Sequence, residues 1–149
     1  MQTMIDRESR NKLAELIRSL VAGIITNDEF EDALPQSKDD AVWEVFHHGV
    51  WCLYSDMKEY KLRGKEALSN EERSVVARWI LFLKSDIEYK WPSASFRDRF
   101  LNSISFGAFG QSTLEKWQEH GELAYWPFTD IAQYNKTKLS KGYLGAKNT

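Results

Sequence analysis

The stretch RWILFLKSDIEYKWPS, residues 78–93, decides the fold of this chain. It opens with an unbroken apolar run over residues 79–83 and ends with acids, aromatic side chains and a proline. On a helix over residues 70–89 that begins after Ser69, the apolar residues of this stretch occupy nearly every side. A helix that is apolar nearly all round is normally buried. The stretch therefore predicts a central, buried helix.

Helix start signals recur along the whole chain. Thr26 and Glu29 have the spacing of a capping box, in which each side chain bonds the backbone N–H of the other residue. The same spacing of serine and acid recurs at Ser37/Asp40, Ser69/Glu72, Ser95/Asp98 and Ser112/Glu115. Each pair precedes a segment with helical periodicity. These signals predict an all-α fold.

The apolar periodicity predicts a single-domain bundle of about five to six helices over residues 1–135. The predicted helices cover residues 6–22, 27–34, 38–61, 70–89, a short segment around 96–104, and 113–120. The first two of these form an αα-hairpin at 6–34. Residues 136–149 contain lysines and no acid, and we expect them to form a mobile basic tail.

Composition narrows the classes of function. The 149 residues are 42% hydrophobic and 13% aromatic, which is enough for a packed core. The net charge of −2 argues against general nucleic-acid binding. The longest apolar run is far shorter than the roughly 20 residues of a membrane span, and the N-terminus lacks a signal region. We therefore expect a cytoplasmic protein with no membrane partner, and the single Cys52 agrees with a reducing compartment.

The strongest charge feature is an acidic segment over residues 27–40. Its acids are Asp28, Glu29, Glu31, Asp32, Asp39 and Asp40, and Lys38 is its only base. Such a surface can steer a basic protein towards it. The segment predicts a binding site for a basic protein partner, and the sequence indicates no oligomeric state.

A second candidate site lies in the opening stretch, where acids alternate with aromatic residues. Its residues are Arg78, Trp79, Asp86, Glu88, Tyr89 and Trp91. Carboxyls buried among aromatic rings can act as general acids. Alternatively, the charged residues fix the helix register as ion partners, and Trp91 covers the core. Both interpretations stay open at this stage.

The helix predicted over residues 38–61 carries a further polar stripe. Its members are Glu44, His48, Cys52, Ser55 and Asp56. Because no second cysteine is present, we interpret the stripe as a solvated face, with no metal and no cofactor. His47 faces elsewhere and is expected to pack between Trp43 and Trp51. The glycine-rich GAFGQST at residues 107–113 is interpreted as a turn between helices.

Two segments resemble sequences of known kinds. LVAGIITNDEFEDAL at residues 20–34 is similar to a helical hairpin of many small bacterial modules. ARWILFLKSDIEYKWP at residues 77–92 resembles a segment of small uncharacterised bacterial helical proteins. The resemblance implies a bacterial source, and it transfers no catalytic or binding residue.

Three functions remain after these observations. The first is a non-enzymatic protein-binding domain, such as an immunity protein that neutralises a toxin, and the absence of a recognisable catalytic motif favours it. The alternative is a small-ligand protein or an enzyme with its pocket near Trp79, Asp86, Tyr89 and Trp91. Nucleic-acid binding through the lysines between Lys136 and Lys147 ranks last.

Overall fold

The computed structural model describes residues 5–91, 119 and 121–141. All regular elements among them are helical, which confirms the predicted all-α class. The α-helices are α1 (Arg7–Val21), α2 (Asn27–Asp32), α3 (Asp40–His48), α4 (Asn70–Lys84) and α7 (Ile131–Lys141). Short 3₁₀ helices cover Val50–Leu53, Gly64–Glu66 and Leu123–Tyr125.

The chain divides into two compact units, whereas the sequence predicts one domain. The first unit extends to Glu88 and includes the chain from Thr137 onward, and the second runs from Tyr89 to Lys136. Residues 136–141 belong to α7, whereas the sequence predicts a mobile basic tail from residue 136. The helices predicted around 96–104 and over 113–120 lie, apart from residue 119, outside the described residues, as do the glycine-rich loop and residues 142–149.

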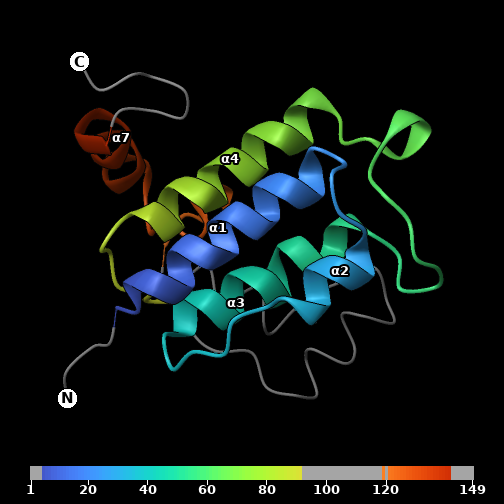
Figure 1. Cartoon of the computed structure of the whole chain (residues 1–149). Helices are drawn as coiled ribbons and strands as arrows, with labels where there is room; N and C mark the ends of the chain where they lie inside the picture. The colour runs from blue at the N-terminus through green and yellow to red at the C-terminus, as the bar shows by residue number, and fades with distance from the viewer. Residues whose placement is uncertain (1–4, 92–118, 120, 142–149) are drawn as a thin grey trace. The chain divides into compact units, whose positions relative to one another are not determined.

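The first unit is built around α1 and α4, which lie side by side (Figure 1). α1 also contacts α2 and α3. α1 is therefore at least as central as α4, which the sequence predicts to be the central helix. The fully buried side chains of this unit include Leu13, Ile17, Leu20, Phe30, Val45, Phe82 and Leu83. They come from all four helices, which therefore share one apolar core.

Two helix starts follow their local signals. Thr26 and Glu29 form the predicted capping box at α2, and Ser69 and Glu72 form the one at α4. α3 differs, because Asp39 rather than Ser37 caps it by accepting from the backbone N–H of Ala41 at 3.0 Å. Local spacing therefore located two caps and missed the third by two residues.

The prediction of a continuous helix over residues 38–61 is wrong beyond His48. α3 ends at Gly49, and a 3₁₀ turn and an irregular segment follow it. A Cβ at Gly49 would lie 2.8 Å from the carbonyl oxygen of Val45 and 3.1 Å from the ring of Trp79. Real Cβ atoms essentially never lie closer than 3.0 Å to another heavy atom, so a side chain at residue 49 would have to displace the Val45 carbonyl and would also crowd the Trp79 ring.

α4 ends at Lys84, five residues before the predicted end at 89. Ser85 closes the helix, and its hydroxyl donates to the carbonyl of Phe82 at 2.6 Å. The carbonyl of Leu83 would accept from Ile87 if the helix continued, but it accepts from Arg7 at 2.8 Å. The buried residues of α4 are Val76 and the run from Trp79 to Leu83, and the first turn of the helix is exposed.

Candidate functional site

The residues of the predicted aromatic pocket have separate structural roles. Trp79 is buried in α4 and packs against Gly49. Asp86 lies beyond the end of α4 and forms an ion pair with Arg7. Arg78 is half-buried on α4, and Glu88 is exposed.

Tyr89 and Trp91 belong to the aromatic core of the second unit. The Tyr89 hydroxyl accepts from the indole N–H of Trp126 at 3.0 Å, and the indole N–H of Trp91 donates to the Pro127 carbonyl at 3.1 Å. Phe128 is fully buried in the same unit. Both side chains therefore have packing partners of their own, and the small-ligand pocket stays a prediction.

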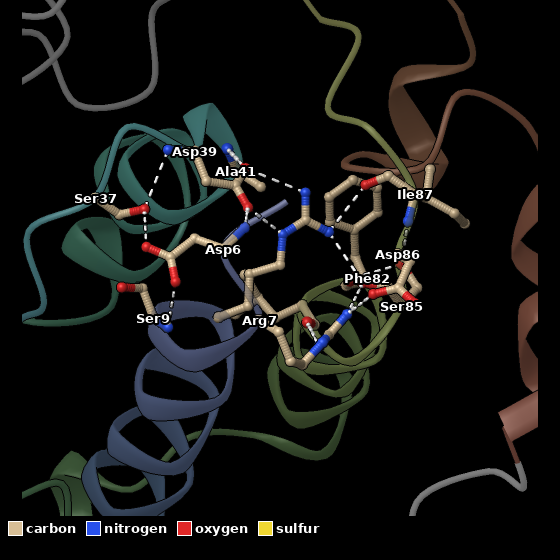
Figure 2. A network of polar contacts seen from close by, with 12 residues as sticks. Asp6, Arg7, Ser9, Ser37, Asp39, Ala41, Phe82, Ser85, Asp86 and Ile87 are labelled. Atoms are coloured by element: carbon tan, nitrogen blue, oxygen red, sulfur yellow. Dashed lines mark hydrogen bonds and ion pairs between the residues drawn. The ribbon is translucent and has the colours of Figure 1, made fainter. Parts of the chain in front are cut away.

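The ends of three helices of the first unit meet at a buried arginine. Arg10 of α1 has no exposed surface, and Asp39 before α3 is 3% exposed. The Nε of Arg10 lies 2.6 Å from Oδ2 of Asp39, and its Nη2 lies 3.1 Å from Oδ1. Its Nη1 donates to the carbonyls of Ser85 and Ile87, beyond α4, at 3.0 and 2.9 Å. Figure 2 shows this network.

Asp39 consequently is not part of the predicted acidic surface. Besides Arg10, its carboxylate accepts from the backbone N–H of Asp6 at 2.9 Å and from that of Ala41. Asp6 in turn caps α1 by accepting from the Ser9 N–H, and these bonds lower the pKa of the Asp6 carboxyl (Figure 2). The protein itself supplies the partners of both carboxylates, so the network is structural.

The acidic surface that remains is centred on α2. Asp28, Glu29 and Asp32 are exposed on this helix, Glu31 is half-buried, and Asp40 is exposed at the start of α3. A residue that sequence reasoning did not assign to this surface joins it, because the exposed Asp56 lies close enough to raise the pKa of Glu31.

We name Asp28, Glu31, Asp32 and Asp56 the α2 acid cluster. Burial is the largest cause of the raised pKa of the Glu31 carboxyl, and the charges of the other three members raise it further. No member forms an ion pair with a basic side chain among the described residues. The negative charge of the cluster is therefore not compensated within this part of the chain.

Tyr54 lies close enough to this cluster to interact with its charges. Its ring packs against Phe30 with centroids 6.4 Å apart, and the residue is 8% exposed. Its buried hydroxyl makes no hydrogen bond of ordinary geometry. Burial raises the pKa of this phenol first, and the charges of Glu31 and Asp56 raise it further. The Tyr54 hydroxyl therefore stays protonated and can donate to a carboxylate of the cluster.

Two further features border the α2 acid cluster. Asp56 accepts from the indole N–H of Trp51 at 3.1 Å, which fixes its carboxylate. The next residue, Met57, is 91% exposed. Met57 therefore places one exposed apolar side chain next to Asp56 in the sequence.

The interpretation of the polar stripe as a solvated face is wrong for Glu44 and His48. The Nε2 of His48 lies 2.6 Å from Oε2 of Glu44, and the side chains of Glu44 and His48 are 2% and 3% exposed. His47 is packed as predicted, with ring centroids 5.2 Å from Trp43 and 5.0 Å from Trp51. Across the described residues, no three His, Cys, Asp or Glu side chains are placed to hold a metal ion.

The charge of Glu31 leads to a stability prediction. Between the ordinary glutamate pKa and the raised pKa of Glu31, the folded state binds more protons than the unfolded state. The free energy of unfolding therefore falls as pH rises through this window. We expect Glu31→Gln to raise the free energy of unfolding by about 0.3 kcal/mol at pH 7 after solvent screening.

Urea unfolding at pH 7 and at pH 4, in low and high salt, measures this effect. The gain from Glu31→Gln should shrink at pH 4 and in high salt, because protonation and ions both weaken the repulsion. Glu71→Gln removes an exposed acid from the first turn of α4 and serves as the control. A loss of stability in Glu31→Gln at pH 7 would show that repulsion is not the dominant effect at this position.

Comparisons with models of protein families, with curated protein sequences and with solved structures found no significant match to this chain. In the part of the chain that the structure describes, no helix combines the length and the apolar character of a membrane span. The function proposed below therefore depends on the geometry and charge of the described residues.

Proposed function

We propose that this chain is a non-enzymatic domain that binds a basic protein through the α2 acid cluster. The observation that carries the proposal is the uncompensated charge of Asp28, Glu31, Asp32 and Asp56, which two separate segments bring together. Complementary charge accelerates association and selects the partner. The exposed Met57 adds apolar area of the kind that anchors protein interfaces.

The other polar networks of the first unit support a binding function over catalysis. Arg10 and Asp39 bind one another and nearby backbone groups, and Glu44 pairs with His48. Asp86 pairs with Arg7. The α2 acid cluster differs from these groups because its carboxylates face the surface without a basic partner among the described residues. An inhibitor of a basic toxin is one form that this function takes.

The test compares two variants of equal net charge. The cluster variant carries Asp28→Asn, Asp32→Asn and Asp56→Asn, and asparagine can still accept the bond from Trp51. The control variant removes three exposed acids elsewhere in the same unit, through Glu8→Gln, Glu71→Gln and Glu88→Gln. Each full-length chain is used for affinity capture from a lysate of its source, followed by mass spectrometry and titration of the captured protein.

We expect wild type and the control variant to retain the same basic protein. The cluster variant should bind it at least about tenfold more weakly, which corresponds to about 1.4 kcal/mol. Binding to wild type should also weaken between low and high salt. Equal affinity for the cluster and control variants would remove the α2 acid cluster as the binding surface.

A further inference from the structure

Asn27 is a buried polar residue whose presence the helix that contains it does not explain. It is the first residue of α2, and it is 1% exposed. A buried side-chain amide is costly unless its donors and its acceptor are hydrogen-bonded. Thr26 and Glu29 already form the capping box of α2, and asparagine is a weaker helix former than alanine. The reason for Asn27 therefore lies outside α2.

The side chain of Asn27 binds a distant segment, residues 55–60, which we call the 55–60 loop. Its Nδ2 donates to the carbonyl oxygens of Ser55 and Lys58 at 3.1 and 2.9 Å. Its Oδ1 accepts from the backbone N–H of Tyr60 at 2.9 Å, and the backbone N–H of Asn27 donates to the Tyr60 carbonyl at 3.2 Å. One buried residue therefore joins both ends and the interior of the loop to the first turn of α2.

Further bonds fix the 55–60 loop. The backbone N–H of Ser55 donates to the Tyr60 hydroxyl at 2.8 Å, which closes the loop on itself. The carboxylate of Glu59 accepts from the Thr26 hydroxyl at 2.7 Å, and this bond is a second connection to the start of α2. The loop is therefore ordered although it contains no helix or strand.

The order of the 55–60 loop does not serve the core. The side chains from Ser55 to Glu59 are all exposed, and Met57 is 91% exposed. Fixing the backbone of a loop costs conformational entropy, and exposed side chains bury little apolar area to offset it. An ordered loop does favour binding, because a loop that is ordered beforehand loses less entropy when a partner binds.

We propose, on the basis of the proposed function, that the 55–60 loop is a preorganised binding loop for the basic partner and that Asn27 is its positioning residue. The two carbonyls that the Asn27 side chain binds belong to Ser55 and Lys58, which flank Asp56 and Met57. Asn27 therefore holds this part of the loop at the start of α2. Release of the loop would keep every charge of the surface but separate its two segments.

The test uses Asn27→Ala and a matched control, Asn70→Ala. Asn70 is likewise the first residue of its helix, α4, and follows a capping box, but it is exposed. Neither substitution changes the net charge. Tyr60→Phe removes only the hydroxyl that accepts from Ser55, and it replaces Asn27→Ala in each measurement if that variant does not fold.

Hydrogen exchange of the full-length chain measures the opening of the loop. The reporter in each variant is an amide whose own acceptor is unchanged, which is Ser55 in Asn27→Ala and residue 60 in Tyr60→Phe. Relative to the amides of α4, we expect exchange to accelerate at least about tenfold in Asn27→Ala and at least about threefold in Tyr60→Phe. Asn70→Ala should change both amides by less than about twofold.

The pKa of Glu31 is a second readout, which a general loss of stability would not move. The charge of Asp56 contributes to the raised pKa of the Glu31 carboxyl. Titration followed by NMR should therefore give a lower pKa for Glu31 in Asn27→Ala than in wild type, because the released loop no longer holds Asp56 near α2. Asn70→Ala should leave this pKa unchanged.

Titration with the basic protein that wild type captures measures the binding role. We expect Asn27→Ala to bind it at least about fivefold more weakly than wild type, and Tyr60→Phe at least about twofold more weakly, because partner binding must then order the loop. Asn70→Ala should bind with the affinity of wild type.

Three results would count against these roles in different ways. Unchanged exchange and an unchanged pKa of Glu31 in Asn27→Ala would overturn the positioning role. Wild-type affinity in a variant whose loop has opened would overturn the binding role, and the proposed function would still stand if the cluster variant bound weakly. Equal affinity for the cluster and control variants would remove the proposed function and the binding role together, while hydrogen exchange would still decide whether Asn27 positions the loop.

Discussion

Replacement of Arg10 by methionine is expected to lower the free energy of unfolding by about 3–5 kcal/mol, because removing one partner of a buried ion pair leaves the other charge uncompensated. Asp39 would stay 3% exposed with its strongest donor gone. The carbonyls of Ser85 and Ile87 would lose the donor that lies 3.0 and 2.9 Å from them. The guanidinium also lies 5.4 Å from the ring centroid of Phe82, and this contact would be lost too.

Urea unfolding followed by circular dichroism measures this effect. Arg18→Met is the matched control, since Arg18 lies on the same helix with a side chain that is 46% exposed and a 3.5 Å pair to Glu15. We expect it to change the free energy of unfolding by less than about 0.5 kcal/mol. The loss of unfolding free energy in Arg10→Lys should lie between the losses in Arg10→Met and Arg18→Met, because an ammonium cannot bind the carboxylate and the two carbonyls together as the guanidinium does. A loss below about 1 kcal/mol for Arg10→Met would contradict the structural role of the pair.

Replacement of Phe30 by alanine is expected to cost about 3–5 kcal/mol, the range for large aromatic truncations in a core. Phe30 is fully buried, and its ring centroid lies 6.0 Å from that of Phe46 and 6.4 Å from that of Tyr54. α2 has six residues, which is too short for stability of its own. The packing of Phe30 therefore holds the helix that carries most of the α2 acid cluster.

Two measurements distinguish the stability cost of the cavity from the local opening of α2. Thermal unfolding gives the cost of Phe30→Ala, and Phe30→Leu should cost less because it leaves a smaller cavity. Hydrogen exchange at the amides of α2 should accelerate in Phe30→Ala by more than the change in global stability requires. If the exchange of α2 followed global stability alone, Phe30 would have no special part in holding the cluster.

The sequence predicts those parts of the fold that depend on neighbouring residues. The boxes of Thr26 with Glu29 and of Ser69 with Glu72 form as their spacing indicates. Gly23 ends the first helix with a φ of 72°, where a residue with a side chain would be strained. Such signals act between residues a few positions apart, and no distant contact changes the helix ends that they predict here.

The errors arise where distant residues decide the local conformation. Apolar periodicity continues through Gly49, but Trp79 packs against this glycine and α3 ends there. Periodicity also continues beyond Lys84, while Arg7 takes the carbonyl that the next helical turn would need. No window of local sequence contains both members of either contact, so periodicity alone could not predict where these helices end.

The candidate site likewise combines residues that the local sequence identifies with residues whose role depends on distant contacts. The acids of α2 could be identified by their density in the sequence. Asp39 could not be separated from them, because its partner Arg10 lies 29 residues away. Asp56 belongs to the predicted polar stripe, but it lies in the part of the predicted helix that does not form. Tyr54 is buried, and the neighbouring charges of Glu31 and Asp56, which come from separate segments, raise the pKa of its phenol.

The buried arginine has a consequence for the newly synthesised chain. Its carbonyl partners, Ser85 and Ile87, follow Arg10 by 75 and 77 residues. While the ribosome has not yet released residue 87, the guanidinium has only water and Asp39 to bind. The buried network of the first unit is therefore completed only after the segment that follows α4 has left the ribosome.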